Sequence, residues 1–388
     1  LFDKLNNLNI KYSSIFYDLK DIKKINYLKE FNINCNKIKI LTIGNAYDDK
    51  VITKKQYNNF FDILFSFNNI ENSLIYLNIK FIYCCYINNK FFEKINNLKL
   101  LRYLYLENIN LDKDFILKIN ELELLSIISC RNIKLSEISN GKLKELCLSE
   151  NEISDINILE KVNFKELKEL DLSFNKISDI NILEKVNFKE LKTLNLNHNS
   201  ILDINILAKG NFKELKELDL SNNGISDISI LAKVNFKELK ILNLSHNRIS
   251  NINKLVKVNF KGLKILNLNR NIISDINILE KLNFKELKEL NLSRNNISDI
   301  NILEKVNFKE LKKLNLSENK ISDVNILEKV NFKELKKLSL NGNRISDINI
   351  LEKVNFKELK ELDLSDNEIS DIKLLEKINF NKLEKLIY

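Results

Sequence analysis

The residue types that usually carry catalysis or metal binding are sparse in this chain and poorly spaced for either task. The sequence contains two histidines, His198 and His246, which occupy the same position in copies of a 24-residue repeat, two copies apart. If each copy adds one strand about 4.8 Å from the next, the two imidazoles are roughly 10 Å apart, too far to share a zinc ion. Ser245 directly precedes His246, so the two side chains point apart on a strand and form no nucleophile–base pair.

Longer sequence signatures of catalysis are also missing. No G-x-S-x-G, H-E-x-x-H or phosphate-binding glycine loop occurs. Acidic residues such as Glu169 and Asp171 recur along the repeats, so they do not single out a general acid and a general base. We therefore predict a protein that is not an enzyme, with no catalytic residues, no cofactor and no metal.

One repeating unit, which runs from Leu143 to the end of the chain, positions these residues. A representative copy is Leu167–Glu190, LKELDLSFNKISDINILEKVNFKE. Ten full copies and the start of an eleventh keep a fixed period of 24 residues, which is typical of a stacked solenoid rather than a compact globule. One asparagine is invariant in the ten copies, at Asn151, Asn175, Asn199, Asn223, Asn247, Asn271, Asn295, Asn319, Asn343 and Asn367.

Each part of the repeat predicts a structural element. Leu170 and Leu172 alternate with polar residues, which predicts one short strand per copy, stacked in parallel. Asn175 follows the strand, where its buried amide would satisfy backbone groups of its own turn and of the neighbouring turn. Asp179 is expected to cap a short helix. Phe188 and its equivalents are expected to form a file of rings through the core.

The pattern L-x-x-L-x-L-x-x-N-x-I closely resembles the leucine-rich repeat family. The following Ser178-Asp179-Ile180 is similar to the class found in bacterial internalins and in the regulatory subunit of a type-1 protein phosphatase, although the period here is longer. The resemblance implies an α/β solenoid, a horseshoe or arc with a parallel sheet on the concave face and short helices on the convex face. It also implies an extended surface that binds another protein.

Three segments are expected along the chain. Residues 1–36 show Leu and Ile spacing typical of amphipathic helices and are predicted to be a helical flank or N-terminal cap. Residues 37–142 are predicted to hold irregular, eroded repeats, with strands around Leu77 and Leu104. Residues 143–388 form the regular array of ten repeats and a truncated eleventh. Because the chain starts with Leu and stops within a repeat, we interpret it as a fragment.

The charge pattern argues against a nucleic-acid partner. The net charge is +9, but residues 143–388 hold 41 basic and 38 acidic residues, interleaved as in Phe188-Lys189-Glu190-Leu191-Lys192. Such interleaving is typical of a solvated surface of mixed sign, whereas nucleic-acid binding needs a basic stripe. The most apolar run, Leu74–Ile87, is too short to span a bilayer. We therefore predict a monomer with no nucleic-acid partner and no membrane span.

The cysteines and the glycosylation sequons predict a location inside the cell. The five cysteines are odd in number and none is spaced as C-x-x-C, so they fit neither a disulfide framework nor a zinc site. Sequons such as Asn243-Leu-Ser and Asn291-Leu-Ser would place glycans on the sheet face of a secreted protein. We therefore expect an intracellular, cytoplasmic protein with reduced thiols at Cys35, Cys84, Cys85, Cys130 and Cys147.

Three positions that vary among the otherwise uniform copies are expected to face a partner. One directly follows the invariant asparagine and includes Lys176, Arg248, Ile272, Lys320 and Arg344. The remaining two carry the predicted anchors. One precedes the second leucine of the strand, and there Ile241 and Ile265 would expose apolar groups on a charged face. The other precedes the invariant asparagine and carries aromatic, His and Arg residues, which are typical anchors of protein interfaces. The predicted partner-binding residues are Phe174, His198, Ile241, His246, Ile265, Arg270 and Arg294.

Three functions remain open on the sequence alone. The first is a non-catalytic protein–protein interaction scaffold that binds its partner on the concave sheet face. The second is a substrate-recruiting adaptor of an enzyme complex, F-box-like or phosphatase-regulatory. The third is a surface adhesin of internalin type, which would need a signal peptide and an anchor.

Overall fold

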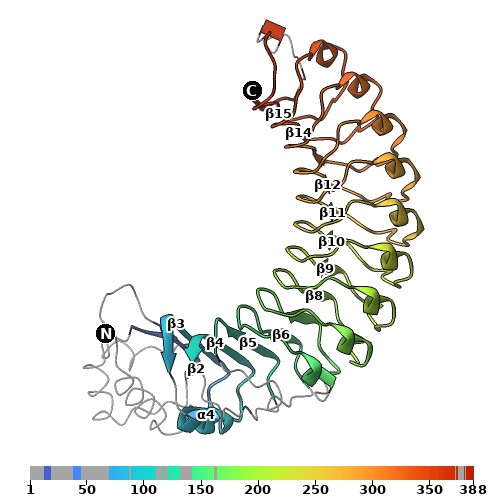
Figure 1. The fold of residues 1–388 in the computed structure, drawn as a ribbon. Helices are drawn as coiled ribbons and strands as arrows, with labels where there is room; N and C mark the ends of the chain where they lie inside the picture. Colours follow the sequence, from blue (N-terminus) through green and yellow to red (C-terminus); the bar gives the residue numbers. More distant parts are fainter. Residues whose placement is uncertain are drawn as a thin grey trace. The chain divides into compact units, whose positions relative to one another are not determined.

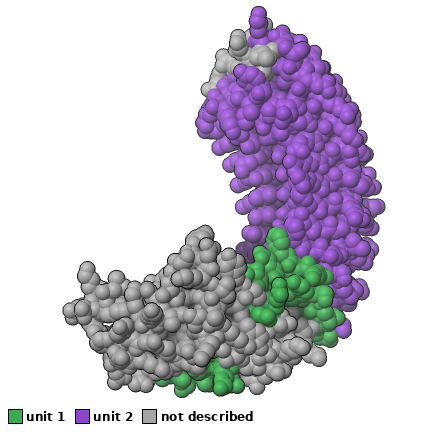
Figure 2. Space-filling view, turned by 60° about the vertical axis from the view of Figure 1, so that its left-hand side comes forward, with its two compact units in different colours: residues 1–176, 186–189 green, residues 177–185, 190–388 purple. Residues whose placement is uncertain are grey.

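The described part of the chain falls into two compact units, shown in different colours in Figure 2. The first comprises residues 1–176 and 186–189, and the second comprises residues 177–185 and 190–388. Within these bounds, a computed structural model describes residues 13–18, 38–44, 70–86, 89–110, 117, 121–131, 142–160, 164–371, 373–374, 380 and 382–388.

The described strands of the first unit are parallel and pair in chain order. They are β1 (Ser13–Asp18), β2 (Ile38–Gly44), β3 (Tyr76–Tyr86), β4 (Tyr103–Asn110), β5 (Leu124–Ile128), β6 (Glu145–Cys147) and β7 (Glu169–Asp171). The helices described with them are η3 (Ile70–Asn72), η5 (Asn157–Glu160), both of the 3-10 type, and the α-helix α4 (Asn89–Asn96). In α4, Phe91 and Phe92 are buried and pack edge to face, with ring centroids 5.0 Å apart.

A regular leucine register runs through these strands although their spacing in the sequence is irregular. Leu104 pairs with Leu77 on one side and with Leu125 on the other, and all three are buried. The strands predicted around Leu77 and Leu104 are therefore confirmed. Residues 13–18 form strand β1, paired along its length with β2, so the prediction of a helical flank is wrong for this stretch. The rest of residues 1–36 lies outside the described residues.

In the second unit, each repeat adds one parallel strand and one 3-10 helix. Figure 1 shows the strands along the inner, concave side of this unit and the helices along its outer side. The strands are β8 (Thr193–Asn195), β9 (Glu217–Asp219), β10 (Ile241–Asn243), β11 (Ile265–Asn267), β12 (Glu289–Asn291), β13 (Lys313–Asn315), β14 (Lys337–Ser339), β15 (Glu361–Asp363) and β16 (Lys385–Ile387). The helices are η6 (Asn181–Glu184), η7 (Asn205–Ala208), η8 (Ser229–Ala232), η9 (Asn253–Lys257), η10 (Asn277–Lys281), η11 (Asn301–Lys305), η12 (Asn325–Glu328) and η13 (Asn349–Glu352).

The helices of the array are tighter than the α-helices that the predicted α/β class implies. Each is a 3-10 helix of four or five residues, a length at which this tighter winding is common. The predicted capping by Asp179 differs in detail: the N-cap of η6 is Ile180, which makes no side-chain cap bond, and Asp179 accepts a hydrogen bond from the backbone N–H of Asn181, two residues on, at 2.8 Å. The equivalent Asp275 accepts one from Asn277, also at 2.8 Å.

The predicted file of phenylalanine rings is present in the core of the second unit. The rings of Phe236 and Phe260 stack with centroids 6.3 Å apart, and those of Phe284 and Phe308 stack at 6.5 Å. All four side chains are buried. Each such pair contributes about 0.5–1.5 kcal/mol beyond the burial of its area, so the file links neighbouring repeats.

The asparagine ladder also links successive turns, as predicted. Asn271 donates to the carbonyl oxygens of Leu244, at 2.9 Å, and Leu268, at 3.1 Å. Its Oδ1 accepts from the backbone N–H of Ile249 at 3.0 Å, so the amide joins two copies. Burial along the ladder is uneven, because Asn199, Asn223 and Asn367 are half-buried whereas the other seven are buried.

Cys130 takes the place of an asparagine in the ladder of the first unit. Its thiol is buried and accepts from the backbone N–H of Ile109, with an N···S distance of 3.4 Å. Its own N–H donates to Oδ1 of Asn151 at 2.8 Å. Cysteine therefore continues the ladder with a weaker acceptor, and the Cys130 thiol has a structural role.

Candidate binding surface on the sheet

Two columns of variable side chains run across the sheet of the second unit. We call the position before the second leucine the strand column and the position before the invariant asparagine the turn column. The strand column is held in register by backbone pairing, as between Ile241 and Ile265. The turn column is held by bonds such as that from the His246 N–H to the Asn269 carbonyl at 2.8 Å. The strand column reads Thr193, Glu217, Ile241, Ile265, Glu289, Lys313, Lys337, Glu361 and Lys385.

The turn column has a left-handed backbone that sequence reasoning missed. His246 has a φ of 53°, Arg270 of 51° and Arg294 of 55°, and in the first unit Phe174 has a φ of 53°. Residues other than glycine adopt this region at a cost of about 1–2 kcal/mol, with Asn, Asp and His tolerating it best. Phe and Arg at this position are therefore held in a conformation that their types do not favour, which makes these positions candidates for function.

Ile241 and Ile265 form an apolar strip on β10 and β11. They pair directly in the sheet, with Glu217 and Glu289 as their neighbours on the outer sides. The sequence predicted exposed side chains, but both are half-buried. The reason is the strand spacing of about 4.8 Å, which lets directly opposed β-branched side chains cover each other.

The apolar strip coincides with a copy that departs from the repeat consensus. Gly262 stands where most copies carry glutamate, as at Glu238 and Glu286. The Nζ of Lys240 occupies the space above this glycine and would be 2.3 Å from an added Cβ. The copy that provides Ile241 therefore lacks a carboxylate that most other copies have, and a lysine takes up the space.

Cationic groups of the turn column follow the strip five residues further along their copies. His246 is half-buried, and its pKa is lowered by burial and then by the positive charges of Arg294 and His198. Arg294 donates through Nε to Oε1 of Glu318 at 2.7 Å, so this predicted anchor has a partner within the chain. Arg270 is exposed and forms no ion pair with the described residues.

Exposed apolar side chains also occur outside the strip. Phe174, in the first unit, is 48% exposed, as the sequence predicted. Leu202 is 66% exposed and Ile272 is 51% exposed, both in the second unit. Leu202 lies over Gly224, with its Cδ2 only 2.4 Å from where a Cβ would stand. Sequence reasoning passed over Leu202, although comparison of the copies could have found it, since the equivalent position is serine in Ser226.

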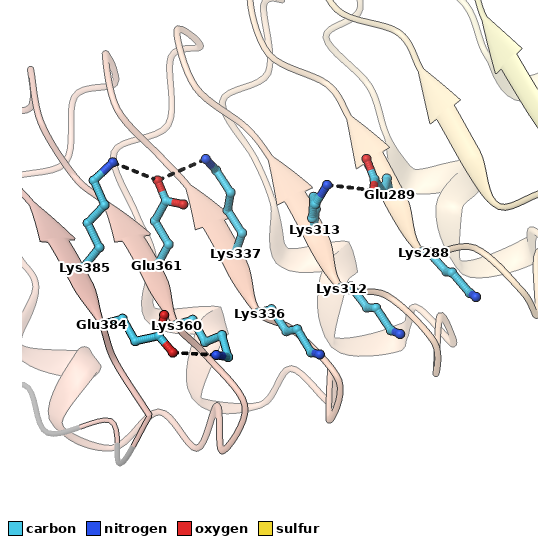
Figure 3. A pocket seen from close by; sticks show the side chains of 10 residues that line it. All are labelled: Lys288, Glu289, Lys312, Lys313, Lys336, Lys337, Lys360, Glu361, Glu384 and Lys385. Atoms are coloured by element: carbon cyan, nitrogen blue, oxygen red, sulfur yellow. Dashed lines mark hydrogen bonds and ion pairs between the residues drawn. The ribbon is translucent and has the colours of Figure 1, made fainter. Parts of the chain in front are cut away.

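A second group that the sequence did not single out is a field of lysines on β12–β16. Figure 3 shows these side chains lining a hollow of about 420 Å³. Interleaving of Lys with Glu along the sequence predicted a surface of mixed sign, but folding gathers lysines from successive copies on one face. The lysine field consists of Lys288, Lys312, Lys313, Lys336, Lys337, Lys360 and Lys385, and the acidic residues in its lining are Glu289, Glu361 and Glu384.

The first unit carries tyrosines on its own sheet. The ring centroid of Tyr76 is 6.4 Å from that of Tyr103 and 5.2 Å from that of Tyr105. Burial, followed by the neighbouring Tyr76 and Glu145, raises the pKa of Tyr105. Burial and the charge of Glu169 raise the pKa of Glu145. Such a cluster could contact a partner, but the second unit holds the larger number of predicted residues.

Comparisons with known proteins agree with this architecture. The family model described as Leucine Rich repeats (2 copies) matches residues 142–185, 189–233, 285–329, 309–353 and 333–386. No curated protein sequence matches the chain significantly. The fold is a parallel-sheet solenoid with one strand and one 3-10 helix per repeat, and the chain is a leucine-rich repeat protein.

Among solved structures, the chain is similar to an internalin from Listeria monocytogenes, with 26% identity, a TM-score of 0.67 and coverage of 96% of each chain. It is also similar to the TLR13–ssRNA13 complex, with 22% identity, a TM-score of 0.65 and coverage of 99% of this chain and 63% of that chain. A third structure is the ectodomain of a membrane receptor kinase from Arabidopsis thaliana in complex with Casparian strip integrity factor 2, with 20% identity, a TM-score of 0.55 and coverage of 90% and 43%. The last two share the fold alone.

Proposed function

We propose that the protein is a non-catalytic scaffold that binds another protein on the sheet face of its second unit. The observation that carries this proposal is the paired Ile241 and Ile265, an apolar strip on a sheet face that is otherwise polar from β8 to β15. His246 and Arg270, five residues further along the same two copies, supply hydrogen-bond donors. An apolar centre with a polar rim is the usual anatomy of a protein interface.

The chemistry of this surface specifies a partner with an apolar side chain flanked by carboxylates. The apolar group would cover the two isoleucines and remove their remaining exposed surface from water, at about 25 cal/mol per Å². The carboxylates would face Arg270, which has no competing ion pair in the described part of the chain. Arg294 would contribute less, because it is already paired with Glu318.

A peptide-display selection tests the proposal and does not require an identified partner. A random-peptide library is panned on the full chain, and enriched peptides are measured by fluorescence anisotropy against wild type and against Ile241→Asp/Ile265→Asp. Loss of a hot spot costs about 2 kcal/mol or more, so affinity should fall by at least about thirtyfold. Enriched peptides should carry an apolar residue next to Asp or Glu.

The matched control adds the same charge to the opposite side of the same repeats. Asn253→Asp/Asn277→Asp changes exposed first residues of η9 and η10, which lie on the helix side. This control should keep wild-type affinity. Equal loss in both variants, or enrichment of peptides that bind the isoleucine variant unchanged, would reject the sheet face of β10 and β11 as the contact.

The adhesin alternative has one observation in its favour, the similarity to an internalin over 96% of both chains. The intracellular location predicted from the cysteines and sequons stays a proposal beside it. Among the described residues, no helix combines the length and apolar character needed to cross a bilayer. Protease treatment of intact cells that express the full-length gene product separates the intracellular scaffold from the adhesin. Protection of the protein supports the intracellular scaffold, and its cleavage at the cell surface supports the adhesin.

A further inference from the structure

The lysine field on β12–β16 carries more positive charge than its own acidic residues can balance. Seven lysines and three glutamates line the hollow, which leaves a net charge of +4. Lys313 pairs with Glu289 at 2.8 Å, and Lys337 and Lys385 share Glu361 at 3.0 and 3.4 Å. The remaining acidic residue, Glu384, is taken by Lys360.

Three lysines are left without a carboxylate. Lys288, Lys312 and Lys336 have none within 4.0 Å in the part of the chain that the structure describes. Figure 3 shows them in one row with their ammonium groups pointing the same way, in line with the paired Lys360 and Glu384 and apart from Lys313 and Lys337. Glu358 lies nearby, but Lys382 donates to it at 2.6 Å.

Backbone bonds fix the spacing of this row. The N–H of Lys312 donates to the carbonyl of Lys288, and that of Lys336 donates to the carbonyl of Lys312, both at 2.8 Å. Neighbouring lysines are therefore one strand spacing apart, about 4.8 Å. Three like charges so close repel one another, and a ligand with negative charges relieves that repulsion.

We propose that the lysine field binds an extended acidic segment of a partner protein. Alternate side chains of an extended peptide are about 6.6 Å apart on one side, a distance that flexible lysines can match. The field begins one strand beyond the apolar strip, because Ile265 pairs with Glu289. The proposal therefore deepens the proposed scaffold function by naming a partner with carboxylates beyond its apolar anchor, although the acidic subsite itself does not need the strip.

Two features of the lining favour a peptide over a single-stranded nucleic acid. The described residues that line the hollow are all lysines and glutamates, so they provide no aromatic platform on which bases could stack. The carboxylates of Glu289, Glu361 and Glu384 stand among the lysines, and each is paired with at least one of them. The same carboxylates can accept hydrogen bonds from peptide N–H groups.

Fluorescence anisotropy with defined probes tests the proposal on the full chain. The probes are a labelled peptide of alternating Asp and Ser, about eight residues long to cover the five strands, its Lys/Ser counterpart, and a labelled oligo-uridine of similar length. The acidic peptide should bind more tightly than either, and its affinity should fall as salt rises, as expected for surface charges. Failure of the acidic peptide to bind at physiological salt, or tighter binding of oligo-uridine, overturns the proposal.

Variants then locate the contact. The triple variant Lys288→Gln/Lys312→Gln/Lys336→Gln removes the unpaired row and should weaken the acidic peptide about tenfold. Its control, Lys285→Gln/Lys309→Gln/Lys333→Gln, removes the same charge from exposed positions, each three residues before a lysine of the row, that do not line the hollow. If both triple variants bind the acidic peptide equally weakly, the attraction comes from net charge alone and the proposed site on the lysine field is wrong.

The isoleucine variant separates this proposal from the proposed function. Ile241→Ser/Ile265→Ser, which removes the apolar strip without adding charge, should bind the purely acidic peptide less than about twofold more weakly than wild type, because the probe has no apolar residue to place on the strip. If the lysine triple variant has no effect while the isoleucine variant abolishes binding of library-selected peptides, the acidic subsite is wrong and the scaffold function stands. The reverse outcome leaves the subsite and rejects the strip. Circular dichroism confirms that each variant is folded.

Discussion

Replacement of Asn295 by alanine should destabilise the protein far more than the same change at its neighbour, Asn296. The amide of Asn295 is 8% exposed. It donates to the carbonyls of Leu268 and Leu292 at 3.0 Å each, and its Oδ1 accepts from the N–H of Ile273 at 2.9 Å. A third donor contact, to Ser293 O, measures 3.1 Å. In Asn295→Ala, the N–H of Ile273 loses its acceptor, and the carbonyls of Leu268, Leu292 and Ser293 each lose a donor.

The magnitude follows from the groups left unpaired. One buried N–H without an acceptor costs about 1–3 kcal/mol, and the carbonyls add less because each keeps a second lone pair. We expect a loss of about 3 kcal/mol for Asn295→Ala. Asn296 is half-buried and its side chain makes no hydrogen bond with the described residues, so Asn296→Ala should stay within about 0.5 kcal/mol.

Urea unfolding followed by circular dichroism measures the difference. With an m value near 3 kcal/mol/M, the midpoint of Asn295→Ala should fall by about 1 M. The midpoint of Asn296→Ala should hardly move. Similar midpoints for the two variants would refute the argument that the amides of the asparagine ladder hold neighbouring copies together.

Three further predictions concern the array and its charges. The pKa of His246, measured by NMR titration, should lie below its ordinary value of 6.5 and should rise in Arg294→Gln, which removes a positive charge. Because folding lowers this pKa, the contribution of His246 to stability is present above pH 6.5 and is lost as the pH falls. The pKa of Glu361, lowered first by the hydrogen bond from Lys337, should rise in Lys337→Gln, and an unchanged titration would contradict the pairing in Figure 3. Deletion of the whole copy Leu287–Glu310 should leave a folded, shorter solenoid by circular dichroism, whereas deletion of half a copy should not.

The regular part of the fold could be predicted because every copy repeats the same physical argument. Leu290 and Leu292 alternate with polar residues, Asn295 follows the strand and Phe308 returns to the core, and each lies where the pattern predicts. Even Cys130, outside the regular array, could be placed in the ladder from its spacing. The strand at Ser13–Asp18 could not, because isolated Leu and Ile spacing does not distinguish a helix from a strand when its pairing partner is unknown.

The candidate surface was less predictable, because it depends on neighbours across copies and on backbone conformation. The turn column varies freely in sequence, yet its backbone is left-handed, with a φ of 51° at Asn222 for example, so side chains there carry a conformational constraint that the sequence does not show. Half-burial of Ile241 follows from Ile265 on the next strand, and the pairing of Arg294 follows from Glu318 in the next copy. The 24-residue period predicts which residues are neighbours across copies, but the distances between their side chains follow only from the structure.

Isoleucine methyl NMR on the complex tests the central claim most directly. Wild-type protein with labelled isoleucine δ1 methyl groups is titrated with a library-selected peptide. The account predicts that the methyl signals of Ile241 and Ile265 shift or broaden together, while that of Ile278 in η10, on the helix side, stays in place. A shift at Ile278 with unchanged signals at Ile241 and Ile265 would contradict binding on the sheet face.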